Sequence, residues 1–162
     1  MDQTMPDTAA PLIRTRTFDE IAVGDSATIE RSLTAEDVQL LATLYGDSDP
    51  QRLAPAFVAS PGFHGVIGHG MWGAALISAV LATRLPGAGS ACQEQALRFH
   101  APVRIGDTLA VQVQAIARDA ATRRIRFACR CTNQQGVLAI DGTVDVTAAG
   151  EGVEYARARL PE

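Results

Sequence analysis

Hydrophobic positions in the first half of the chain follow first the period of a strand and then that of a helix. Residues 27–33 alternate between apolar and polar side chains, which is typical of a strand with one buried face. Thr34 can cap the start of a helix with its hydroxyl. Gly46 stands where a left-handed cap would end that helix, so Asp47 is expected to begin a loop. Four apolar side chains recur at helical spacing in between: Val38, Leu41, Ala42 and Tyr45.

The second half predicts one enclosed helix and a run of strands. After a loop rich in Pro and Gly, residues 69–84 are apolar on nearly every side, so we expect a helix wrapped by other structure. One buried helix against an antiparallel sheet is an α+β arrangement, and we expect the strands to form a meander. Period-2 patterns separated by turn residues predict the strands at 92–100, 108–118, 123–132 and 137–147.

Length and charge favour one domain that binds neither nucleic acid nor anionic membrane. The chain has 162 residues, a mass of 17.1 kDa and a net charge of −4, which suits a single core without an extended basic surface. Residues 1–17 and 149–162 show no sustained period and are expected to be tails around a domain at 18–148. The longest apolar run, 71–82, is shorter than the ~20 residues that a membrane helix needs.

The basic residues and the cysteines exclude several kinds of site. All fourteen basic residues are Arg, so Schiff-base chemistry on lysine and a Walker-type phosphate loop are excluded. Three cysteines without an apolar leader segment favour a reducing cytoplasm. Cys129 and Cys131 are two apart in a strand pattern and share a face, where core packing is a better interpretation than a zinc site. We therefore predict no metal.

Candidate chemistry gathers around Gly46-Asp47, Asp49-Pro50 and His69-Gly70-Met71. A carboxylate in a turn offers a proton acceptor, and a helix that opens with His-Gly offers free backbone donors. Further motifs stand at Phe18-Asp19-Glu20-Ile21, Gly24-Asp25, Leu97-Arg98-Phe99, Pro102-Val103 and Ile105-Gly106-Asp107. Together, over roughly residues 18–148, these motifs resemble the MaoC-like hot-dog domain family of (R)-specific enoyl-CoA hydratases and acyl dehydratases.

The resemblance implies a sheet wrapped around the long helix and a homodimer whose two sheets pair side by side. It implies an acyl-CoA thioester as substrate and partner, with coenzyme A present only as part of that substrate and no other cofactor. Asp47 matches the Asp that acts on the water, and Gly70 matches the Gly whose N–H holds the thioester oxygen. His69, Ser78 and Leu81 fall at substrate-binding positions. His69 could equally cap the helix, and Ser78 could equally bond back to a helix carbonyl.

Arg52 departs from the family pattern, because it stands where the resemblance implies the His that works with Asp47. An imidazole exchanges protons near neutral pH, whereas a guanidinium stays protonated, so Arg52 cannot shuttle a proton. Asp49 similarly replaces an Asn of the motif, and His64 is a nearby imidazole that could reach the site. Three functions stay open: (R)-specific hydration of trans-2-enoyl-CoA or the reverse dehydration of 3-hydroxyacyl-CoA, impaired by Arg52; a non-catalytic acyl-CoA-binding or regulatory subunit; and an acyl-CoA thioesterase that uses Asp47 alone.

Overall fold

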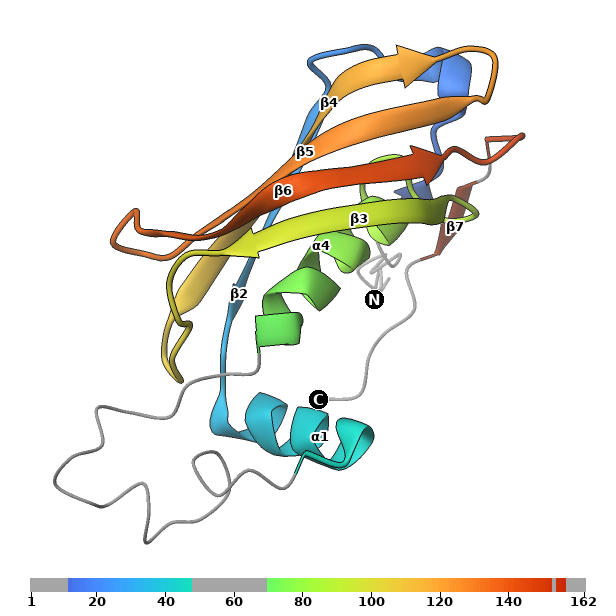
Figure 1. Ribbon diagram of the computed structural model, residues 1–162. Helices are drawn as coiled ribbons and strands as arrows, with labels where there is room; N and C mark the ends of the chain where they lie inside the picture. Colours follow the sequence, from blue (N-terminus) through green and yellow to red (C-terminus); the bar gives the residue numbers. More distant parts are fainter. Residues whose placement is uncertain (1–11, 48–69, 153, 157–162) are drawn as a thin grey trace, which may run out of the picture.

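A computed structural model of the protein describes residues 12–47, 70–152 and 154–156. In these residues an antiparallel sheet of five strands curves around helix α4, Gly70–Thr83 (Figure 1). The predicted α+β arrangement of a sheet around one long helix is confirmed. In spatial order the strands are β2 (Ser26–Ser32), β4 (Thr108–Asp119), β5 (Arg124–Thr132), β6 (Leu138–Thr147) and β3 (Ala91–Phe99).

The core lies between α4 and the concave face of the sheet. Ile77 and Val80 of α4 are fully buried, as expected for a helix with no polar face. Inward-facing side chains alternate along the strands with exposed ones, which confirms the predicted period of two. The buried side chains of the three central strands include Val111, Val113, Ile125, Phe127, Val144 and Val146.

Gly73 allows α4 to lie unusually close to the sheet. A Cβ atom at this position would overlap Cδ1 of Ile140, a side chain that is only 1% exposed. Glycine removes that overlap, so the helix backbone rests directly on β6. The depth at which α4 sits in the curved sheet therefore depends on a missing side chain.

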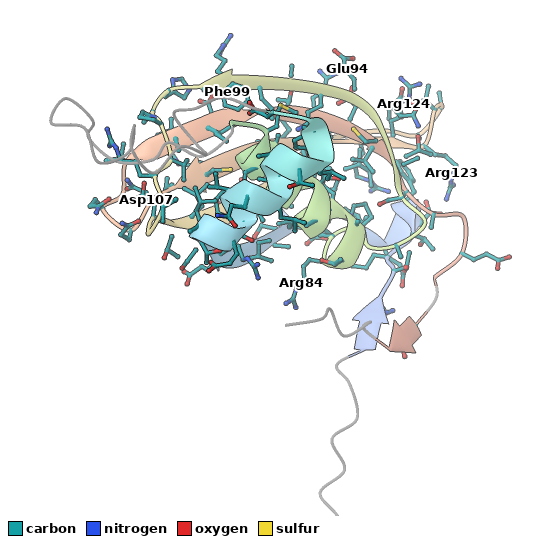
Figure 2. The ribbon with its side chains drawn as sticks, turned by 90° about the horizontal axis from the view of Figure 1, so that it is seen from below. Arg84, Glu94, Phe99, Asp107, Arg123 and Arg124 are labelled. Carbon is teal, nitrogen blue, oxygen red and sulfur yellow. The ribbon has the colours of Figure 1, made fainter. Side chains whose placement is uncertain are left out.

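Helix α1, Ala35–Tyr45, begins and ends where the sequence predicts. The Asp37 N–H donates to Thr34 Oγ1, and the Thr34 N–H donates to Asp37 Oδ2, each over 3.1 Å, which forms a reciprocal cap. Gly46 ends the helix in the left-handed region, with φ 66° and ψ 27°. Val38 and Ala42 of α1 are buried. Helix α1 lies on the open side of the sheet, below α4 in Figure 1 and in front of α4 in Figure 2.

The strand order differs from the predicted meander at β3. Strands β4, β5 and β6 follow one another as expected, but β3 pairs with β6 at one edge, and β2 pairs with β4 at the other. The connection from β3 to β4 must therefore cross the open end of the sheet. Two backbone bonds pin its far end to the chain beyond β2: Leu33 N–H donates to Asp107 O and Gly106 N–H donates to Leu33 O, each over 2.9 Å.

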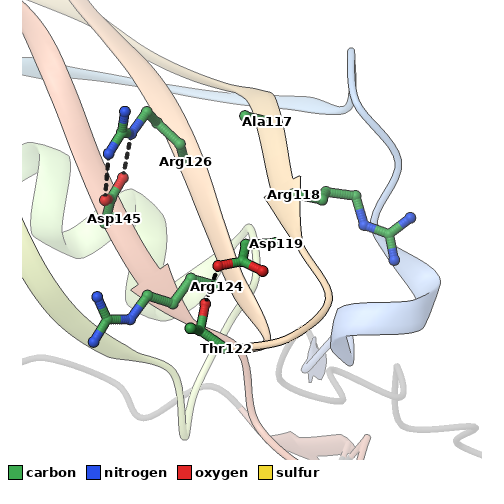
Figure 3. A pocket seen from close by; sticks show the side chains of 7 residues that line it. All are labelled: Ala117, Arg118, Asp119, Thr122, Arg124, Arg126 and Asp145. Atoms are coloured by element: carbon green, nitrogen blue, oxygen red, sulfur yellow. Dashed lines mark hydrogen bonds and ion pairs between the residues drawn. The ribbon is translucent and has the colours of Figure 1, made fainter.

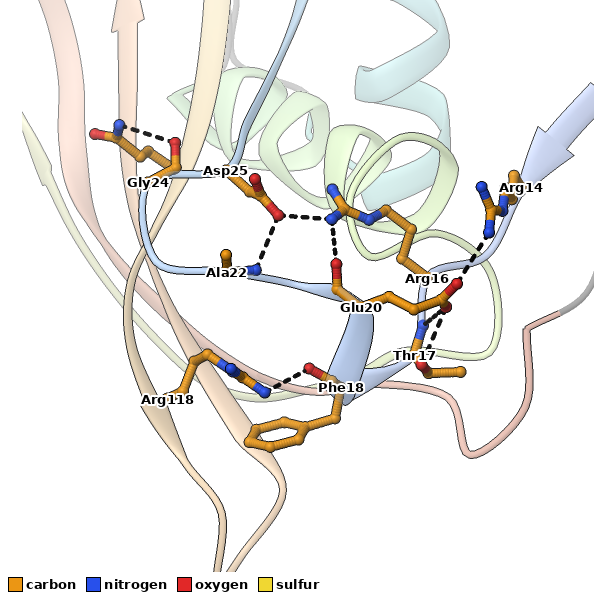
Figure 4. Close-up of polar contacts among 10 residues, drawn as sticks. Arg14, Arg16, Thr17, Phe18, Glu20, Ala22, Gly24, Asp25 and Arg118 are labelled. Atoms are coloured by element: carbon orange, nitrogen blue, oxygen red, sulfur yellow. Dashed lines mark hydrogen bonds and ion pairs between the residues drawn. The ribbon is translucent and has the colours of Figure 1, made fainter.

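The two segments assigned to tails contain short strands that pair with each other. Strand β1 (Leu12–Arg14) runs antiparallel to β7 (Glu154–Ala156). Beyond β1, the buried Thr15 donates through its hydroxyl to Ala88 O over 2.9 Å. Arg16 donates to Asp25 Oδ2 over 2.6 Å and also to the Glu20 carbonyl (Figure 4). These contacts hold Thr15 and Arg16 against the domain, and Thr15 is held close to the C-terminal end of α4.

Cys129 and Cys131 are buried in the core, as their shared face predicts. Burial raises the pKa of each thiol to about 12, so both stay protonated near neutral pH. Within the described ranges there is no cluster of His, Cys, Asp and Glu that could hold a metal ion. None of the helices in that same part of the chain is both long and apolar enough to span a bilayer.

We predict that Gly142→Ala destabilises the fold by about 3 kcal/mol, because a side chain on β6 at this point would meet the backbone of β3. The new Cβ would overlap the Ala96 carbonyl oxygen and lie 2.9 Å from the Leu97 Cα. Gly136→Ala is the matched control, since Gly136 also has a positive φ, +78°, but no neighbour within 4 Å. Urea unfolding of both variants measures the difference, and equal losses of about 1 kcal/mol would show that crowding at β3 is unimportant.

Candidate active site

Asp47 occupies a fixed position immediately after α1. The left-handed turn at Gly46 redirects the chain, and the Asp47 N–H donates to the Ala42 carbonyl over 2.9 Å. Asp47 is half-buried. The helix cap therefore sets where the carboxylate leaves the backbone, as the sequence predicted.

Gly70 is the first residue of α4, where backbone N–H groups have no acceptor within the helix. The partial positive charge of a helix N-terminus strengthens these donors toward an anionic oxygen. Gly70 is exposed, so a ligand can reach this end of the helix. The arrangement suits stabilisation of negative charge that develops on a carbonyl oxygen.

Phe99 forms a wall beside Gly70. A Cβ atom at position 70 would lie 3.4 Å from Cε1 and 3.5 Å from Cδ1 of the Phe99 ring. Phe99 is opposite Ile140 in the β3–β6 register, and Ile140 rests on Gly73 one helical turn further on. Because Phe99 is in the edge strand, its ring remains 53% exposed. An aromatic surface therefore borders the first turn of α4.

Ser78 and Leu81, which the resemblance assigns to substrate binding, both line one small cavity. The cavity has a volume of about 80 Å³ and lies between α4 and the edge strand β3. Within the described residues the Ser78 hydroxyl has no hydrogen-bond partner, so it faces the cavity instead of bonding back to a helix carbonyl. The walls are formed by Ser78, Leu81, Ala82, Ser90, Cys92, Gln95 and Val146.

Several candidate residues lie outside the described part of the chain: Asp49, Arg52, His64 and His69. Sequence reasoning did not single out Phe99 or Cys92 as parts of a site. The Leu97-Arg98-Phe99 motif could have pointed to Phe99 as a site residue. Cys92 is opposite the buried Val146 in the β3–β6 register, so its position on the inner face of the sheet could have pointed to Cys92. Neither pattern alone shows which helix residue the side chain meets.

A larger hollow of about 350 Å³ lies at the β4–β5 hairpin, and both of its carboxylates are already paired (Figure 3). Arg126 donates to both oxygens of Asp145, over 2.6 and 2.7 Å, and these bonds lower the pKa of that carboxyl. Asp119 accepts from the Thr122 hydroxyl over 2.7 Å, which lowers its pKa as well. Both carboxylates stay ionised, so this hollow offers no proton donor, and the candidate site remains at α4.

Comparison with known protein families shows to which family this chain belongs. The profile of the MaoC like domain matches residues 21–134, a stretch that includes α1 and α4 and extends through β5. The chain belongs to the MaoC-like domain family. The membership that the motifs suggested is therefore confirmed.

Relatives of this MaoC-like domain cover nearly its whole length. A 3-hydroxybutyryl-CoA dehydratase from Methylorubrum extorquens is 40% identical over 132 residues, which are 82% of this chain and 83% of that protein. An (R)-specific enoyl-CoA hydratase from Rhodospirillum rubrum is 36% identical and covers 83% of this chain and 93% of its own length. The unliganded (R)-hydratase of Pseudomonas aeruginosa matches with a TM-score of 0.88 at 36% identity, covering 94% and 97% of the two chains. The fold is the hot-dog fold.

The MaoC-like domain should present one reactive thiol in the native state. Cys92 is exposed beside the cavity, whereas Cys129 and Cys131 are buried and protonated. We predict that an aromatic disulfide reagent modifies one thiol per chain at pH 8 and three after unfolding, and that Cys92→Ser abolishes the native reaction. Rapid modification of a second thiol in folded Cys92→Ser would contradict the buried placement of the other two.

Proposed function

We propose that the protein is an (R)-specific enoyl-CoA hydratase, which adds water to trans-2-enoyl-CoA or, in reverse, removes water from 3-hydroxyacyl-CoA. The observation that carries the proposal is a carboxylate at the end of α1 on the same side of the sheet as the N-terminus of α4. The names of the relatives from Methylorubrum extorquens and Rhodospirillum rubrum support the same pair of reactions.

The proposed chemistry divides the work between Asp47 and Gly70. The Asp47 carboxylate accepts a proton from water as the water oxygen bonds to C3 of the enoyl group, and Asp47 then gives this proton to C2, which restores the carboxylate. Electron density passes to the thioester oxygen during the addition, and the Gly70 N–H donates to that oxygen. Phe99 lies against Gly70 and forms an apolar wall on one side of the donor.

Arg52 limits this activity, since a guanidinium cannot return the proton that an imidazole would carry. A second function follows from the same substitution: an acyl-CoA-binding subunit that keeps the thioester site but does not turn substrate over. Binding needs the helix N-terminus and the acyl cavity, both of which the described residues supply. Catalysis also needs a proton carrier.

We further propose that the enzyme is a homodimer in the cytoplasm, with no cofactor beyond the coenzyme A of its substrate and with neither nucleic acid nor membrane as a partner. Strand β3 is one of the two edge strands of the five-stranded sheet and is exposed along most of its length. An unpaired edge of this length is a template for a second strand. Three free cysteines fit a reducing compartment.

The proposed reaction is tested by loss of the conjugated absorbance of crotonyl-CoA, with release of free thiol followed in parallel. We expect the wild type to hydrate crotonyl-CoA slowly. Asp47→Asn, which keeps the shape but removes the base, should lower kcat/KM by about 100-fold or more. Arg52→His should raise kcat/KM by about tenfold or more, because it restores an imidazole.

The outcomes separate the candidate functions. Glu94→Gln on the exposed strand β3 is the matched control for loss of a carboxylate and should leave kcat/KM unchanged. Absence of hydration in the wild type, with activity gained in Arg52→His, would replace the hydratase by the binding subunit. Thiol release that disappears in Asp47→Asn would instead identify a thioesterase.

The dimer is tested by sedimentation equilibrium of the full chain, which should give twice the monomer mass of 17.1 kDa. Gln95→Pro, in the middle of β3, should shift the equilibrium toward monomer. The carbonyl of the next residue, Ala96, faces β6, so the N–H of Gln95 faces the other side of the strand, where a second copy would pair. A monomeric wild type at concentrations of about 100 μM would exclude a stable dimer.

A further inference from the structure

The turn between β5 and β6 bonds to the connection that leads into β4. Gln134 of this turn uses both ends of its side-chain amide: Oε1 accepts from the Thr108 N–H over 3.0 Å, and Nε2 donates to Asp107 Oδ1 over 3.0 Å. The second carboxylate oxygen, Asp107 Oδ2, accepts from the Arg104 N–H over 2.8 Å. An amide carries a donor and an acceptor on one carbon, so glutamine satisfies both of its partners at once.

The β5–β6 turn holds Gln134 in a fixed place. Asn133 Oδ1 accepts from the N–H groups of Gln135 and Val137, over 3.0 and 2.9 Å. The Asn133 N–H donates to Val137 O over 3.0 Å, and the Gly136 N–H donates to Asn133 O over 2.9 Å. Because its neighbours are bonded to one another, Gln134 presents its amide to the β3–β4 connection from a closed turn.

Asp107 in turn bonds to the chain that leads into α1. Its carbonyl accepts from the Leu33 N–H, and the Gly106 N–H donates to the Leu33 carbonyl, each over 2.9 Å. Leu33 is only 1% exposed, and the residue after it, Thr34, caps the helix. One continuous set of hydrogen bonds therefore links Gln134 to the residue that precedes the cap of α1.

The place of Asp47 depends on the direction of α1, because this residue stands just beyond the far end of the helix. Helix α1 has 11 residues, which gives a length of about 16 Å. Over that length a tilt of about 4° at the start moves the far end by about 1 Å. A misplacement of about 1 Å can slow a catalysed step by about 100-fold. Contacts at the start of α1 therefore bear on the chemistry at its end.

We propose that Gln134 is a positioning residue of the hydratase: through Asp107 and Leu33 it fixes the direction of α1, and so the place of the Asp47 carboxylate. The role of Asp47 rests on the function proposed above. The hydrogen bonds from Gln134 to Asp107 and from Asp107 to Leu33 do not, because they join groups of the folded chain and need no substrate.

Gln134→Glu breaks the link with little change of shape, because a second carboxylate oxygen replaces the donor to Asp107. We expect kcat for crotonyl-CoA to fall by about fivefold or more and KM to stay within about twofold of the wild type, since the thioester is proposed to bind at α4. Gln135→Glu is the matched control and should change neither constant. It alters the charge in the same way one residue further on, where the side chain is exposed and has no hydrogen bond within the described residues.

The double variant Gln134→Glu with Asp107→Asn exchanges the donor and the acceptor. The new amide can donate to the new carboxylate and still accept from the Arg104 N–H, and the new carboxylate can accept from the Thr108 N–H. We expect this exchange to restore kcat to within about twofold of the wild type. Asp107→Asn alone should lower kcat, because one glutamine amide then cannot satisfy both Thr108 and the new amide.

Nuclear magnetic resonance tests the same set of bonds without turnover. In Gln134→Glu the Leu33 and Gly106 amides should exchange with solvent about fivefold faster or more, because both N–H groups donate in the link. The amide resonance of Asp47 should also move, since the helix end shifts. Both effects should disappear in the double variant and be absent in Gln135→Glu. Far-ultraviolet circular dichroism confirms that each variant is folded.

Each result bears on one of the two proposals. A loss of kcat in Gln134→Glu that the double variant restores supports the positioning role. An unchanged kcat, an equal loss in Gln135→Glu, a change in KM alone or a loss that the double variant does not restore overturns that role and leaves the hydratase intact. A wild type that hydrates nothing removes the hydratase, and the Asp47 resonance then decides: a shift that the double variant reverses supports the positioning of Asp47, and an unmoved resonance overturns it.

Discussion

The close approach of α4 to the inner face of the sheet determines the rest of the architecture. A helix without a polar face gains stability only when it is enclosed, and a curved sheet can enclose it on one side. Gly73 brings the helix backbone onto Ile140, and Gly70, one turn earlier, lies against the Phe99 ring. The same pair of glycines therefore sets the depth of the helix in the sheet and places its N-terminus beside an aromatic wall. Packing and the candidate chemistry share one surface.

Enclosure of α4 by the sheet is incomplete, since Met71, Ala75, Ser78 and Ala82 stay exposed along the helix. Strand β3 completes the sheet at one edge, where it pairs with β6. Gly142 allows this close pairing, because a Cβ atom there would overlap the Ala96 carbonyl oxygen. Along its other side β3 has no partner strand among the described residues, so that side can accept a strand of a second copy.

Local signals predicted local structure well and long-range pairing poorly. Helix α1 follows from the Thr34 cap, one apolar face and Gly46, all of which act within a few residues. The position of β3 beside β6 could not be predicted, because period-2 patterns do not specify which strands pair. Ser78 and Leu81 entered the site through family resemblance, whereas the contact of Phe99 with Gly70 depends on the packing of α4 against β3.

The proposed function combines two requirements that fall on different parts of the chain. Binding of the thioester rests on the start of α4 and on the packing of that helix against the sheet. Proton transfer rests on Asp47 and on position 52, where Arg52 stands in place of the imidazole of the family pattern. A substitution at position 52 can therefore change turnover while the packed core of α4 and the sheet stays the same. Binding of an acyl thioester should persist in this protein whether its turnover is fast, slow or absent, because the helix proposed to bind the thioester is also the helix around which the domain folds.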